Sequence, residues 1–153
     1  MNPTARLAEL TTERMRLLER ILSLSEQQRE LVRFGNTTEL LGLLGIKQKM
    51  MSMLETLERA LDPFREEDPE KRVWDSESAR DACRTTISRC DLLLRKILEC
   101  DRESEATMQE RKDGLQRQIK QLESGRASGE YLRQSQETGA VPHTRLDLKS
   151  EAS

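Results

Sequence analysis

Aromatic residues are scarce in this 153-residue chain, at 3% of the sequence, and only seven glycines and four prolines are present. Val and Ile together number eight, whereas Leu alone numbers 23. Sheets are enriched in β-branched and aromatic residues, while Leu, Glu, Arg and Gln favour helices. The composition therefore argues against a sheet-based fold of any size and predicts an all-α protein.

An excess of charge of one sign is also missing. The chain carries 26 Lys and Arg against 28 Asp and Glu, a net charge of -2. A basic field of the kind that holds nucleic acid or an anionic membrane is therefore not expected. No stretch reaches the roughly 18 to 20 apolar residues that span a bilayer, and charged residues interrupt positions 1–20, where a secretory signal would need an apolar core. We expect a cytoplasmic protein.

Residues that carry chemistry are few. Cys83, Cys90 and Cys100 fall in one long helical pattern, where rigid positions seven apart cannot form a disulfide, so we expect reduced thiols packed as small core residues. His143 is the only histidine and lies in a polar segment, which argues against a zinc site. Phosphate-binding, nucleophile and metalloprotease motifs are missing. We therefore expect no enzyme activity and no cofactor.

What the sequence does contain is a leucine repeat of helical period. Apolar residues recur at alternating steps of three and four residues, which is typical of helices that pack side by side. The pattern predicts one turn at Gly35 and Asn36 and a helix end at Pro63, because Gly and Asn terminate and cap helices and Pro interrupts them. The predicted helices cover about residues 5–34, 37–61 and 76–124.

The start of the second predicted helix is more apolar than one stripe requires. Leu41, Leu44 and Ile46 lie outside the repeat, around Gly42 and Gly45. Each glycine weakens a helix by about 1 kcal/mol relative to Ala, which predicts either close helix packing or local plasticity at this end. Of these two interpretations, close packing is the one we favour.

The connector after the second helix contains the two large aromatic side chains Phe64 and Trp74. We expect both to fold back over the end of the bundle, with binding of a partner as the alternative. A short helical turn is predicted to begin at Pro69, with Asp68 as its cap.

The third predicted helix is longer than its neighbours. Short connections predict an antiparallel three-helix bundle or coiled coil, in which the third helix outruns the first near Ala106 and protrudes. Its apolar stripe nevertheless continues beyond that point, and exposed apolar stripes mark sites for a partner helix. A second copy of the chain could cover the same stripe, or the second helix could be longer than predicted. The candidate client-binding residues are Leu41, Leu44, Met108, Leu115, Ile119 and Leu122.

From residue 125 to residue 153 the sequence becomes rich in Ser, Gly, Gln, Thr and Arg, so we expect a flexible, disordered C-terminal tail. Tyr131 and Leu132 are scattered apolar residues in this segment. They fit either a simple disordered end or a short linear motif that orders when it binds a partner.

The sequence resembles the flagellar export chaperones of the FlgN type. The resemblance rests on two leucine-striped helices joined at a Gly-Asn turn, the segment LLGLLGIKQ at Leu40–Gln48, a proline-marked connector, a long third helix and a polar tail with one Tyr. It implies a cytosolic chaperone that holds amphipathic C-terminal helices of hook-associated proteins and delivers them to the type III export gate. It further implies that Tyr131, with Leu132 beside it, contacts the cytosolic domain of that gate.

A different class of function also fits the pattern. The same apolar stripe could make the protein a self-associating coiled-coil scaffold without chaperone activity, in which case the partner would be a second copy. A helical-bundle enzyme would need clustered carboxylate and histidine ligands, and the lone His143 argues against that.

Overall fold

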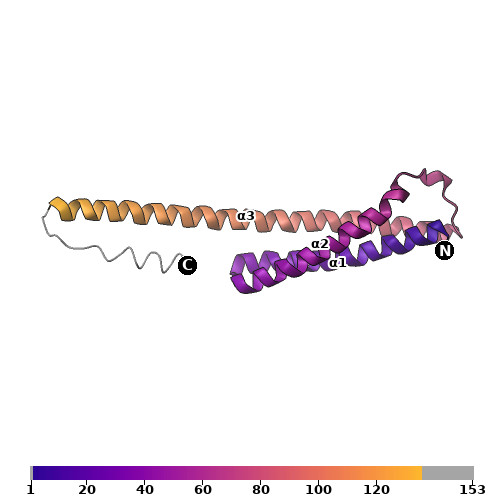
Figure 1. Cartoon of the computed structure of the whole chain (residues 1–153), viewed down its shortest axis with the longest axis horizontal. Helices are drawn as coiled ribbons and strands as arrows, with labels where there is room; N and C mark the ends of the chain where they lie inside the picture. The colour runs from indigo at the N-terminus through magenta and orange to yellow at the C-terminus, as the bar shows by residue number, and fades with distance from the viewer. Residues whose placement is uncertain (1, 136–153) are drawn as a thin grey trace. The chain divides into compact units, whose positions relative to one another are not determined.

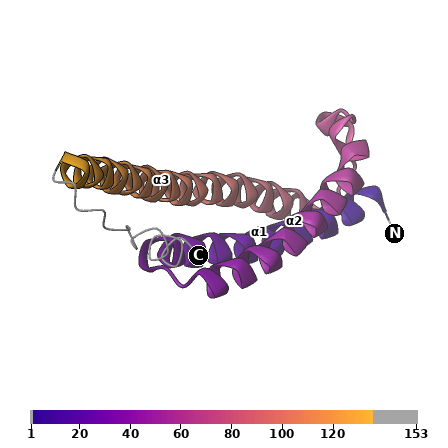
Figure 2. The same ribbon diagram turned by 60° about the vertical axis from the view of Figure 1, so that its left-hand side comes forward.

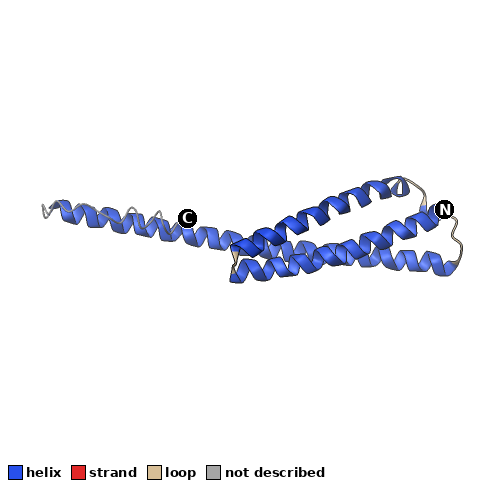
Figure 3. Cartoon of the chain, turned by 60° about the horizontal axis from the view of Figure 1, so that its bottom comes forward, coloured by secondary structure: helices blue, strands red, loops and turns tan. Residues whose placement is uncertain are grey.

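The computed structural model describes residues 2–135. Within this range the chain forms three α-helices and one 3-10 turn, and it contains no strand, so the predicted all-α class is confirmed (Figures 1 and 3). None of the described helices combines the length and the apolar character that crossing a bilayer requires. The elements are α1 (Pro3–Phe34), α2 (Thr37–Arg65), the turn η1 (Pro69–Lys71) and α3 (Glu77–Ser135).

The chain divides into two compact units. The first comprises residues 1–108 and contains α1, α2 and the N-terminal part of α3. The second comprises residues 109–153, of which 109–135 are described and form the remainder of α3. Both hydrophobic clusters of the described residues lie in the first unit.

Both ends of α1 are defined by specific caps. The Asn2 side chain accepts hydrogen bonds from the backbone N–H groups of Thr4 and Ala5, and Pro3 occupies the first turn, where no backbone donor is needed. At the other end Gly35 adopts a left-handed conformation with φ 49° and ψ 61°. The predicted turn at Gly35 is thus confirmed, because this conformation costs Gly less than any other residue.

Helix α2 begins as predicted but ends later. Asn36 caps it by accepting a hydrogen bond from the Glu39 N–H at 3.1 Å. The expectation that Pro63 ends the helix is wrong, because α2 continues to Arg65 with Pro63 inside its last turn. Near a helix end Pro removes only one backbone hydrogen bond. The Arg65 side chain holds the extra turn by donating to the Glu58 carbonyl at 3.2 Å.

The connector between α2 and α3 is attached to the start of α1. Thr4 Oγ1 donates to the Val73 carbonyl at 2.8 Å, and Asn2 Nδ2 donates to Asp75 Oδ1 at 2.8 Å. Phe64 and Trp74 pack against the buried cluster of Leu7, Leu10, Leu61 and Cys83, so their predicted role in covering the bundle end is confirmed. The predicted turn at Pro69 is also present, capped by Asp68.

The central core of the first unit joins all three helices. Leu18, Ile21 and Cys90 are each 0% exposed, and Leu93 is 1% exposed. Helices α1 and α2 lie side by side in antiparallel directions, and the N-terminal half of α3 packs against them (Figure 2). The buried residues of this central cluster are Leu17, Leu18, Ile21, Leu54, Cys90, Leu93 and Ile97.

The buried face of α3 is rotated relative to the predicted stripe. The leucine-type repeat predicts Ile87, seven residues before Leu94, on the buried side of this helix, but Ile87 is 38% exposed, whereas Leu93 and Cys100 are buried. The steps along this face are three residues from Cys90 to Leu93 and from Ile97 to Cys100. Because positions 92, 93 and 94 are all Leu, hydrophobic periodicity alone does not distinguish these registers.

Among the described residues, ion pairs connect α1 with α2, α2 with α3 and α1 with α3. Arg14 on α1 pairs with Glu58 on α2 at 2.5 Å, and Lys47 on α2 pairs with Asp101 on α3 at 2.6 Å. The third pair joins Arg29 of α1 to Glu103 of α3 at 3.1 Å. Polar residues that interrupt the leucine repeat, such as Arg14 and Lys47, therefore contact charged residues of another helix.

Burial on α3 stops before the helix does. Ser104 is 1% exposed and none of residues 105–129 is buried, yet the helix continues to Ser135. The predicted helix end at Ser124 therefore moves to Ser135, and residues 125–135 are helical rather than part of a tail. Gly125 and Gly129 do not stop the helix, because an interior Gly weakens a helix by about 1 kcal/mol without preventing it. Of the predicted tail, residues 136–153 lie outside the described range.

Candidate functional site

The second unit presents an apolar stripe without a core beneath it. Leu115 is 59% exposed, Ile119 43% and Leu122 49%, and Met108 at the boundary is 48% exposed. Steps of four and three residues place Leu115, Ile119 and Leu122 on one side of α3. In contrast with the core leucines of the first unit, such as Leu18 and Leu93, none of these side chains is buried. We call Met108, Leu115, Ile119 and Leu122 the α3 stripe.

Basic side chains predominate around the α3 stripe. Residues 109–129 contain five Lys or Arg and three Asp or Glu. A shallow hollow of about 560 Å³ adjoins Ile119 and is lined on its polar side by Asp113, Gln116, Arg117 and Lys120. The stripe therefore offers apolar contacts with a moderately positive border, which suits an amphipathic helix better than a small polar ligand.

The other predicted client contacts lie in the first unit. Leu41 is 64% exposed, whereas Leu44 is half-buried. The expected close packing at Gly42 and Gly45 is wrong, because a Cβ atom added to either residue would meet nothing within 4 Å. Both glycines are exposed to solvent, so their effect on α2 is to weaken the helix rather than to admit a neighbouring one.

The two residues predicted to contact the export gate lie on α3. The helix extends through Tyr131 and Leu132 to Ser135, so their backbone is helical. Sequence reasoning placed them in a tail because Gly125 and the polar composition that follows resemble a helix end. Amphipathic spacing is weak in this segment, which leaves little signal for a helix.

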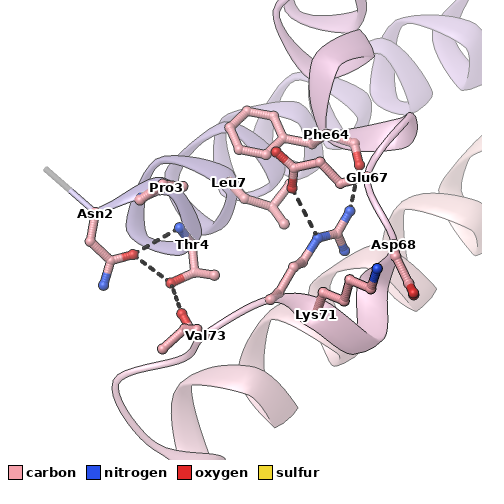
Figure 4. A pocket seen from close by; sticks show the side chains of 10 residues that line it. Asn2, Pro3, Thr4, Leu7, Phe64, Glu67, Asp68, Lys71 and Val73 are labelled. Atoms are coloured by element: carbon pink, nitrogen blue, oxygen red, sulfur yellow. Dashed lines mark hydrogen bonds and ion pairs between the residues drawn. The ribbon is translucent and has the colours of Figure 1, made fainter.

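A cavity of about 660 Å³ lies where the connector meets the start of α1 (Figure 4). Its apolar wall includes Leu7 and Phe64, and its polar side includes Arg72. The Arg72 guanidinium donates to the Phe64 carbonyl at 2.5 Å and lies 3.6 Å from the Glu67 carboxylate. Because Arg72 already bonds to its own chain, the cavity has the features of a structural junction.

A groove that the sequence analysis did not predict lies between α1 and α2, and we call it the α1–α2 groove. It has a volume of about 450 Å³ and is lined by Glu13, Arg16, Leu17, Arg20, Met53, Thr56 and Leu57. Met53 is 55% exposed within it. The signal in the sequence was Met53, an apolar residue that lies outside the leucine repeat, at a position where a solvent-exposed helix face would ordinarily carry a polar side chain.

The buried thiols are shielded from reaction. All three cysteines are free and buried, as predicted. Burial raises the pKa of Cys90 above its ordinary value and outweighs the opposing effect of Arg14. Burial likewise raises the pKa of Cys100, although the Arg29 guanidinium lies 3.6 Å from its sulfur. A raised pKa disfavours the thiolate, which is the reactive form of cysteine.

Within residues 2–135, no three His, Cys, Asp or Glu side chains gather closely enough to hold a metal ion. The described surfaces that stand out carry exposed apolar side chains, on α3 and in the groove between α1 and α2. Comparison with protein-family models, with curated proteins and with solved structures finds no match to this chain.

Proposed function

We propose that the protein is a cytoplasmic export chaperone that binds amphipathic C-terminal helices of flagellar hook-associated proteins and delivers them to the type III export gate. The observation that carries the proposal is the α3 stripe, whose four apolar residues are 43–59% exposed on a continuous helix. The resemblance of the sequence to export chaperones of the FlgN type supplies the identity of the client.

The physical role is protection of an apolar surface. A subunit whose terminal helices later pack into a filament must keep their apolar faces covered before assembly. The α3 stripe can cover such a face by helix-to-helix packing, with anchors at steps of three and four residues. Within the first unit, the exposed Leu41 is a separate candidate contact for a client. Tyr131 and Leu132 contact the gate.

Co-expression with a C-terminal helical fragment of a hook-associated protein tests the proposal. We expect a complex that co-purifies, and we expect the double substitution Leu115→Glu with Ile119→Glu to abolish it, because two buried carboxylates would remain unpaired in the interface. Ser124→Glu is the matched control: it adds a charge to the opposite side of the same helix, and it leaves the complex intact.

Two results would contradict the chaperone proposal. One is a client fragment that neither co-purifies nor gains solubility in the presence of the protein. The other is a tight dimer in sedimentation experiments whose stability does not change when the client is added and which dissociates when Leu115→Glu is introduced. That result would identify the alternative, a self-associating scaffold.

A further inference from the structure

The groove between α1 and α2 is a second surface suited to a helix, and it is independent of the α3 stripe. Leu17, 5% exposed, forms part of its floor, and Met53 and Leu57 line the α2 side. Every lining residue comes from α1 or α2, so the groove lies wholly within the first unit. Its volume of about 450 Å³ accommodates several apolar side chains.

Exposed apolar residues extend the groove along α2. Ile46 is 51% exposed and precedes Met53 by seven residues, which is two helical turns, so both lie on the same side of the helix. Gly42 is four residues before Ile46, and a Cβ atom there would meet nothing within 4 Å. The strip from Gly42 to Met53 is about 16 Å long at 1.5 Å per residue, the length of three helical turns.

Exposed cationic side chains lie beside this groove. Arg16 and Arg20, four residues apart on α1, are exposed, and Lys49 is exposed on α2 between Ile46 and Met53. Among the described residues none of these three cations forms an ion pair. Of the described residues that line the groove, Glu13 is the one that is acidic. A partner with carboxylates on its border would pair with cations that the protein leaves unused.

We propose that the α1–α2 groove binds an amphipathic helix of a different protein, with Leu- or Met-type anchors on one face and acidic residues along its borders. The charge pattern argues against pairing of two such grooves and against docking of residues 109–129 of a second copy. Pairing of two such grooves would bring Arg16 and Arg20 against Arg or Lys side chains, and residues 109–129 are themselves net basic. A docked helix would make a fourth helix beside α1 and α2.

Two labelled synthetic peptides of about 18 residues, titrated against the full chain, test this proposal by fluorescence anisotropy at low salt. Both have Leu at helical spacing on one face; one has Glu on its borders, and the other has Lys at the same positions. We expect the Glu peptide to bind at least about tenfold more tightly, because its carboxylates meet the cations of the groove. Arg16→Glu with Arg20→Glu should reverse this preference, and Met53→Ser should weaken binding of the Glu peptide.

Arg95→Glu with Lys96→Glu is the matched control, since it makes the same charge change at exposed α3 positions that form no ion pair in the described structure. The proposal would be overturned if the control variant weakened binding of the Glu peptide as much as Arg16→Glu with Arg20→Glu does, or if the latter variant left binding unchanged. Loss of peptide binding in Leu115→Glu would place the peptide on the α3 stripe instead. A dimer in sedimentation that Met53→Ser disrupts would make a second copy the occupant.

Discussion

Glu58 is the residue on which the charges of the first unit converge. It accepts hydrogen bonds from Arg14 on the neighbouring helix and from Arg65 on its own helix. Partial burial pushes the pKa of this carboxyl up, but the hydrogen bonds from Arg65 and Arg14 outweigh burial and hold the pKa below its ordinary value of 4.5. The ionised form of Glu58 therefore stabilises the contact between α1 and α2.

This lowered pKa predicts a pH dependence of stability. In the unfolded chain Glu58 titrates near 4.5, and in the folded protein it titrates lower. Between these values the unfolded state binds more protons, so the contribution is complete above about pH 4.5 and is lost as the pH falls through the folded pKa. We expect Glu58→Gln to lower the free energy of unfolding by about 1–2 kcal/mol at pH 7 and by less at pH 3.

Urea unfolding of both proteins from pH 3 to pH 7 measures this difference. Glu55→Gln is the control, because Glu55 is 75% exposed and pairs only with Arg59, one turn away on the same helix. Its effect should stay below about 0.5 kcal/mol and vary little with pH. Parallel pH curves for wild type and Glu58→Gln would show that ionisation of Glu58 does not contribute to stability.

At the scale of the element, α2 is weakened at its N-terminal end. Gly42 and Gly45 lie in the helix interior with open space around them, and both φ values are in the ordinary helical range. Gly at such positions costs conformational entropy and gains no contact. The first turns of α2 should therefore open more readily than the segment from Leu54 to Leu61, whose end residues are buried.

Replacing these glycines by alanine should stabilise the protein. We expect Gly42→Ala and Gly45→Ala each to raise the free energy of unfolding by about 0.5–1 kcal/mol, since Ala restricts the unfolded chain and clashes with nothing in the folded one. Gly35→Ala should instead destabilise by about 1–2 kcal/mol, because its φ of 49° is left-handed. Thermal unfolding followed by circular dichroism distinguishes the stabilising from the destabilising substitutions. A loss of stability in Gly42→Ala would show that Gly42 is packed against another part of the protein.

Much of the first unit follows from the sequence, because leucine periodicity, Gly35, Asn36 and Asp68 act locally. Where the sequence is ambiguous, tertiary contacts decide. Leu93 rather than Leu94 enters the core because the neighbouring helices select one of several adjacent leucines. Pro63 stays helical because Arg65 supports the final turn. The α1–α2 groove was not predictable, since it depends on how two helices pack and not on either helix alone.

At the scale of the whole molecule, the two units differ in what holds them together. The first has two clusters of buried residues that join its helices, whereas none of residues 105–129 is buried. Tertiary packing supplies most helix stability in proteins, and isolated helices in water are marginal. Folding stability should therefore reside in the first unit.

A chain truncated after Met108 should still unfold cooperatively, with a midpoint temperature within about 5 °C of the full chain, because the loss of exposed helix removes little buried surface. A separate peptide of residues 109–135 should be mostly unfolded at 25 °C by circular dichroism at 222 nm. Failure of the truncated chain to fold would show that the second unit contributes to the core. A stable helix in the peptide would show that residues 109–135 need no packing.

The three buried thiols lie at successive positions along α3 within the first unit. Cys83 belongs to the cluster near the connector, Cys90 to the central cluster, and Cys100 lies further along α3 beside Arg29. An alkylating reagent can reach each sulfur only when the surrounding helices separate, so its rate of modification measures the local opening free energy at that position. Comparison of the three rates therefore shows whether the helices separate more readily near the connector or near the turn between α1 and α2.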